Sequence, residues 1–129
     1  MSMYADRTAV VTFQATSWSG WSPDHYPITT SARLRVAKGS ALNPETLGER
    51  RSDYAEIPSL FYELLVERLV AEQVLFTYRN LVVENSDGSV NLSGPRTGHF
   101  ILRPGNSMRL SSATLDAGTS VSVTLDAIH

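Results

Sequence analysis

Alternation of apolar and polar residues is the pattern that most restricts how this chain folds. It is clearest in residues 7–16, where alanine, valine and phenylalanine on one face alternate with valine, threonine and glutamine on the other. Residues 28–37 and 119–128 alternate in a similar way. Successive side chains of a β-strand point to opposite faces, so each segment is predicted to be a half-buried strand.

Turn signals divide the second half of the chain into short segments. Asn-Ser-Asp-Gly at 85–88 contains Asp-Gly, a favoured pair for a tight hairpin. Short strands are predicted at 89–93, 98–103, 107–115 and 119–128, separated by glycine and proline. Strands at this spacing are typical of an antiparallel β-sandwich or small barrel, here of about 6–7 strands.

One segment departs from this pattern and predicts an inserted α-helix at about 58–72. Pro58 suits a first helical turn. At about 100° per residue, one broad apolar stripe forms. Its members are Phe61, Tyr62, Leu65, Val66 and Leu69.

A second, narrower stripe on this predicted helix suggests an oligomer interface. We expect the interface to comprise Leu60, Leu64, Glu67, Arg68 and Ala71. The alternative is a helix nearly enclosed by its own fold. Burial of the two leucines within the monomer removes the main argument for the interface.

Length and composition predict one globular domain that remains where it is made. The 129 residues suffice for a single core, and the segment 38–56 is predicted to be a long surface loop. Within it, Asn43 and Pro44 favour one helical turn at 44–47. No apolar run is long enough to span a membrane and no signal peptide is visible, which predicts a cytoplasmic origin. The net charge of −2 argues against nucleic acid and membrane partners.

Aromatic and imidazole side chains gather at residues 18–26, between the first two predicted strands. Flat rings there suit contact with a sugar or with another protein. The alternative is that the tryptophans fold back as a lid over the open end of the sandwich. The candidate contact residues are Trp18, Trp21, His25 and Tyr26.

Four arginines form the only basic cluster visible in the sequence. Arg33 and Arg35 fall on the outer face of the second predicted strand, and Arg50 and Arg51 lie in the following loop. They suit phosphate binding or ion pairs with an acidic helix of another subunit.

Residues with catalytic or metal-binding spacing are absent from the sequence. It has no cysteine, no nucleophile motif and no phosphate-binding glycine loop. Its three histidines do not have the spacing of a metal site. We therefore expect no enzyme activity, metal or cofactor.

Three functional hypotheses remain. The first is a non-catalytic structural subunit that forms homo-oligomers and also contacts other protein subunits. A phage head–tail or tail component of a virion is an example. A sandwich flanked by one helix is an architecture of several such proteins. The alternative is a lectin-like carbohydrate-binding module that uses the aromatic loop 18–26. A small hydrolase or isomerase using His25 or His99 is the third.

Overall fold

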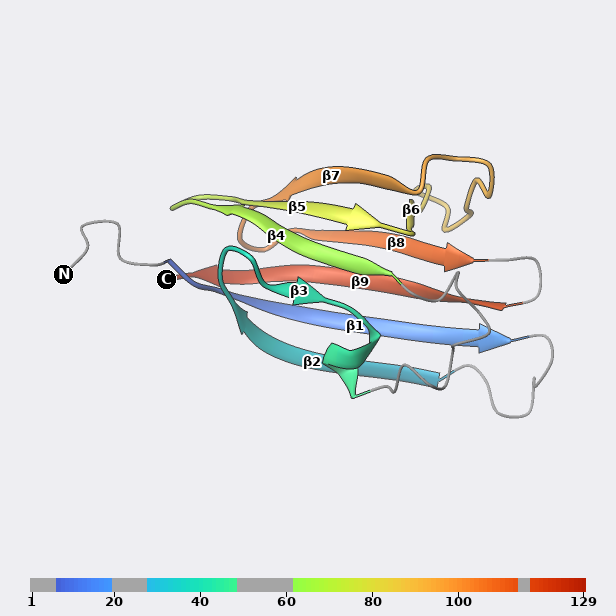
Figure 1. Cartoon of the computed structure of the whole chain (residues 1–129), viewed down its shortest axis with the longest axis horizontal. Helices are drawn as coiled ribbons and strands as arrows, with labels where there is room; N and C mark the ends of the chain where they lie inside the picture. Colours follow the sequence, from blue (N-terminus) through green and yellow to red (C-terminus); the bar gives the residue numbers. More distant parts are fainter. Residues whose placement is uncertain (1–6, 20–27, 49–61, 114–116) are drawn as a thin grey trace.

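The computed structural model describes residues 7–19, 28–48, 62–113 and 117–129. Within these ranges, nine strands form two antiparallel sheets that pack as a sandwich. Figure 1 shows the strands of both sheets running along the long axis of the molecule. The prediction of a mainly β, antiparallel sandwich is therefore confirmed.

The first sheet has five strands in the order β2-β1-β9-β8-β6. The predicted strands near both ends of the chain are confirmed here. Residues 8 and 129 are paired, since His129 N–H donates to the Thr8 carbonyl over 2.7 Å. The strand bounds are β1 (Ala9–Ser19), β2 (Ile28–Val36), β6 (Val82–Val83), β8 (Ser107–Ala113) and β9 (Ala117–Ile128).

The second sheet has four strands in the order β3-β4-β5-β7. Its edge strands are the short β3 and the longer β7, which pairs with β5 alone. The bounds are β3 (Ala41–Leu42), β4 (Glu63–Leu69), β5 (Val74–Arg79) and β7 (Thr97–Leu102).

The core fills the space between the inner faces of the two sheets. Phe13 on β1 meets Tyr62, just before β4, edge to face at a centroid distance of 6.3 Å. Phe76 on β5 stacks on Phe100 of β7 at 5.2 Å. Apolar side chains of β1 and β9 bury their surface against β4 and β5, and this removal of apolar area from water drives the two sheets together.

The predicted helix at 58–72 is wrong for the residues that the structure describes. Residues 63–69 form strand β4, which pairs with both β3 and β5. Residues 70–72 lie in the turn that joins β4 to β5, where Val70 N–H donates to the Gln73 carbonyl. The remaining residues of the prediction, 58–61, lie outside the described ranges.

A β-bulge explains why this strand resembles a helix in sequence. The pairing with β5 skips Glu67, which is the extra residue between Val66 and Arg68. A bulge places two residues opposite one and so interrupts the alternation. The side chains that reach the core are therefore Leu64, Val66 and Leu69, two and then three positions apart. This uneven spacing imitates the apolar stripe of a helix.

The segment 38–56 is more ordered than the predicted surface loop, as far as it is described. It contains β3 and a 3₁₀ turn, η2 (Pro44–Leu47), which confirms the predicted helical turn. Asn43 caps η2 by accepting from Thr46 N–H over 3.1 Å, and its own N–H donates to the Thr46 hydroxyl. Leu42 and Pro44 are buried, so this stretch is part of the sandwich. In the described part of the chain, no helix is both long and apolar enough to cross a bilayer.

The turn at 85–88 is confirmed, but the strand predicted at 89–93 is wrong. Gly88 N–H donates to the Asn85 carbonyl, and Gly88 has a positive φ of 86°. The Asp87 carboxylate accepts from both the hydroxyl and the N–H of Ser89, which lowers the pKa of Asp87. Residues 89–93 turn instead of extending because the Asn91 side chain accepts locally from Ser93 N–H.

Candidate functional site

The outer face of the five-stranded sheet is polar along its central strands. The alternation that sends apolar side chains of β1 and β9 into the core leaves hydroxyl and amide side chains outside. Gln14 of β1 lies opposite Ser122 of β9, which in turn lies opposite Arg109 of β8. Adjacent strands are about 4.8 Å apart, so these three side chains form a row across the sheet.

A shallow groove of about 270 Å³ lies on this face. Every lining residue has a polar side chain, and they come from three adjacent strands. The lining residues are Gln14, Thr16, Ser107, Arg109, Ser120, Ser122 and Thr124.

Some polar side chains of the groove are hydrogen-bonded to each other or to β2, whereas two in its middle are not. At one end Ser107 and Thr124 share a hydrogen bond of 2.7 Å, and Thr16 bonds to a threonine of β2. Between them, the side chains of Gln14 and Ser122 have no partner among the described residues. An amide and a hydroxyl each donate and accept, so the groove offers both functions to a ligand.

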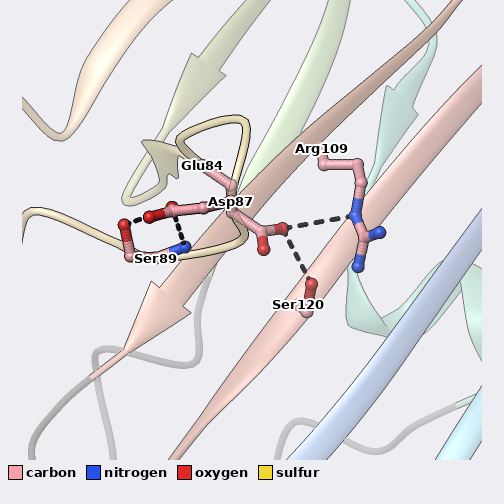
Figure 2. A network of polar contacts seen from close by, with 5 residues as sticks. All are labelled: Glu84, Asp87, Ser89, Arg109 and Ser120. Atoms are coloured by element: carbon pink, nitrogen blue, oxygen red, sulfur yellow. Dashed lines mark hydrogen bonds and ion pairs between the residues drawn. The ribbon is translucent and has the colours of Figure 1, made fainter.

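A nearly buried carboxylate borders the groove (Figure 2). Glu84 lies just after β6, and only 7% of its side chain is exposed. Its Oε2 accepts from the Ser120 hydroxyl over 2.9 Å and lies 3.7 Å from Nε of Arg109. The Glu84 carboxylate therefore joins β8 and β9 and holds one edge of the guanidinium.

Trp18 extends the same face beyond Thr16. It occupies the outward position of β1 two residues later, and it is 38% exposed. Its partner on β9 is Gly118, which has no side chain to cover the ring. The structure therefore brings one of the predicted contact residues to the polar face. The other three, Trp21, His25 and Tyr26, lie outside the described residues.

Two arginines of the predicted basic cluster lie on this face at its β2 edge. Arg33 and Arg35 are both exposed and two positions apart. Arg33 Nε lies 3.5 Å from the carboxylate of Asp126, and Arg35 donates to the hydroxyl of Thr8. The other two members, Arg50 and Arg51, are outside the described residues.

The predicted oligomer interface does not form one surface. Leu64 is fully buried in the core, because it points inward from β4. Glu67, Arg68 and Ala71 are exposed, and Leu60 is outside the described residues. The argument for the interface depended on two apolar stripes of a helix, and it fails because residues 63–69 form a strand.

Two of the three histidines are among the described residues. His99 is exposed on β7, and His129 is exposed at the end of the chain. No group of three or more histidine, aspartate or glutamate side chains in the described ranges is arranged to hold a metal ion.

Several groove residues were not identified from the sequence. The outward positions of residues 7–16 already included Gln14 and Thr16, but threonine and glutamine are common on the solvated face of a strand and do not indicate a site. The same holds for Ser122. Arg109 and Glu84 meet only because β8 pairs with β6, which a single sequence does not reveal. The one available signal was the run of short polar residues at alternate positions of two strands.

Comparisons with known proteins found no matching family model, no matching curated protein and no matching solved structure.

Proposed function

We propose that this protein is a non-catalytic, lectin-like carbohydrate-binding module whose site is the polar face of the five-stranded sheet. The observation that carries the proposal is the groove: free amide and hydroxyl groups at its centre, with an exposed tryptophan on the same face. The site is the face of a sheet, whereas the sequence predicted a loop, and Trp18 is the predicted contact residue that the described part of the chain places on this face.

The chemistry of the groove suits a sugar. Each sugar hydroxyl donates and accepts hydrogen bonds, as do the free side chains of Gln14 and Ser122. The apolar face of a sugar ring packs on an aromatic ring, and Trp18 offers such a surface at low entropic cost. An open, shallow groove on a rigid sheet holds these groups in place and admits a chain longer than one sugar.

The proposal is tested by alanine variants of the two groups that contact the sugar. We expect Trp18→Ala and Gln14→Ala each to weaken glycan binding at least about tenfold, or 1.4 kcal/mol. Gln14 is exposed, so the melting temperature of its variant should change little, whereas Trp18 is 38% exposed and its variant also loses some packing. Glycan-array screening followed by calorimetric titration measures the effect.

Gln73→Ala is the matched control, because Gln73 lies in the turn between β4 and β5 of the other sheet. Wild-type protein that binds no glycan on a broad array, or a Gln73 variant that loses binding equally, contradicts the proposal.

A second candidate function, the homo-oligomeric structural subunit, is supported by edge strand β7. The strand contains no lysine, arginine, aspartate, glutamate or proline, the residues that usually protect an exposed edge. Ile101 projects from it with 52% of its surface exposed, beside Leu75 of β5. The occupant we propose is a second copy, because two identical strands without lysine, arginine, aspartate or glutamate pair about a twofold axis without repulsion between such side chains. Incorporation in a virion is one setting for such a subunit.

Light scattering during size-exclusion chromatography tests this candidate with two matched lysine substitutions. We expect Ile101→Lys to convert a dimer or larger oligomer to monomer, because a charge is placed at the paired edge. Ile28→Lys is the control, since Ile28 is similarly exposed, at 48%, but lies on β2 of the other sheet. A wild-type protein that stays monomeric at all concentrations excludes the structural-subunit candidate.

A further inference from the structure

Arg109 is the one charged side chain among the described residues that line the groove. Its side chain is 69% exposed and belongs to the row that contains Gln14 and Ser122. A neutral sugar needs no fixed positive charge at this position. The residue therefore bears on which sugars the groove accepts.

Arg109 contacts Glu84 through Nε, and its two terminal nitrogens have no partner among the described residues. Figure 2 shows the contact with Glu84 made through Nε, with the two terminal nitrogens beyond it. Glu84 is itself held by the hydroxyl of Ser120, and its side chain is nearly buried, so it is a rigid support. The N–H groups of both terminal nitrogens are left to donate in parallel, which is the geometry that a carboxylate accepts.

The charges around the groove favour an anion. Arg33, Arg35 and Arg109 lie on the outer side of this sheet, against two carboxylates, Glu84 and Asp126. Each carboxylate is already engaged by an arginine and by a hydroxyl of β1 or β9. Counted over these described residues, the face has one more positive than negative charge, in a chain whose net charge is −2.

We infer that the groove binds an acidic polysaccharide, a chain of uronic acids, and that Arg109 receives a sugar carboxylate through its two terminal nitrogens. This inference rests on the proposed carbohydrate-binding function and adds the class of sugar. Gln14 and Ser122 then bond to ring hydroxyls, and Trp18 packs on a sugar farther along the same face.

Calorimetric titration with a matched pair of polymers tests the inference. Polygalacturonic acid and its fully methyl-esterified form have the same sugar backbone, but only the acid presents a carboxylate. We expect the acid to bind at least about tenfold more tightly. Its affinity should also fall with added salt, since part of the attraction is between exposed charges.

Arg109→Gln should remove the preference and bring the acid to the affinity of the ester. Arg109→Lys should keep only part of it, because an ammonium lacks the bidentate geometry. Arg68→Gln, on the outer face of the other sheet, is the control and should bind like the wild type. Both arginines are exposed, and Glu84 keeps its hydrogen bond from Ser120 in Arg109→Gln, so these variants should fold, which thermal denaturation checks.

The outcomes separate the two proposals. Equal binding of acid and ester overturns the uronic acid inference and leaves the carbohydrate-binding function intact. Binding of neither polymer, together with a blank glycan array, overturns both. Binding of poly-L-glutamate as tightly as polygalacturonic acid also overturns both, because the groove then recognises a carboxylate that is not attached to a sugar.

Discussion

Replacing Leu64 with alanine is expected to lower the free energy of unfolding by about 2–5 kcal/mol, the range for truncating a buried leucine. Leu64 points inward from β4 with none of its surface exposed. Leu65, its neighbour, faces outward and is only half-buried. Leu65→Ala is therefore expected to cost about 1 kcal/mol or less. Denaturation in urea measures both changes, and an unchanged slope confirms that stability alone has altered.

This pair of leucines also distinguishes the strand from the helix that the sequence predicts. In that helix Leu65 belongs to the broad stripe that docks on the sheet, whereas Leu64 belongs to the surplus stripe. The helix therefore predicts the opposite order of effects. A larger loss at Leu65 than at Leu64 would contradict strand β4.

Replacing Gly98 with alanine is expected to lower the free energy of unfolding by about 1–3 kcal/mol, the range for overpacking. A Cβ atom there falls 2.5 Å from Oη and 2.7 Å from Cζ of Tyr78. Tyr78 lies on β5 directly opposite Gly98 and crosses it toward Phe100, with ring centroids 6.2 Å apart. The tyrosine is 8% exposed and has little room to move away. The effect is steric, since Gly98 is not among the glycines with positive φ.

A double-mutant cycle isolates this contact. Thermal or urea denaturation of Gly98→Ala should show a much smaller loss in a Tyr78→Ala background, because the clash has been removed. Equal losses in the two backgrounds would mean that the glycine is needed for a reason other than the tyrosine ring.

The strands that the sequence predicted correctly are those with regular alternation. β1, β2 and β9 lie side by side in one sheet, and each has one solvated face and one inward face, which is buried in β1 and β9 and mostly half-buried in β2. A strict period of two then appears directly in the residue types. The turn at 85–88 was equally visible, because Asp87 and Gly88 suit that turn through local hydrogen bonding and positive φ.

β4 was misread because its alternation is broken at Glu67. Glutamate, leucine and arginine have high helix propensity, and the bulge supplies an apolar spacing that resembles a helix. Pairing with β3 and β5 outweighs that propensity, and this pairing involves residues distant in sequence. The strand predicted at 89–93 failed for a local reason, the side-chain bond of Asn91 to the backbone.

The candidate site was less visible in the sequence than the fold. Trp18 stood out in the sequence because it belongs to the cluster of aromatic and imidazole side chains at residues 18–26. Gln14 and Ser122 became a site only through the register that places them opposite each other. Arg109 acquired its role through Glu84, which reaches the groove from the other side of β8.

By itself the sequence determined the β-sandwich class, the regular strands and the turn between residues 85 and 88, because period-two burial and turn chemistry are local properties of the chain. Only the tertiary structure decided that residues 63–69 form a strand, that Leu64 is core, and that one sheet face carries a groove. The physical reason is strand pairing. Hydrogen bonding between distant segments sets the register, and the register determines which side chains meet.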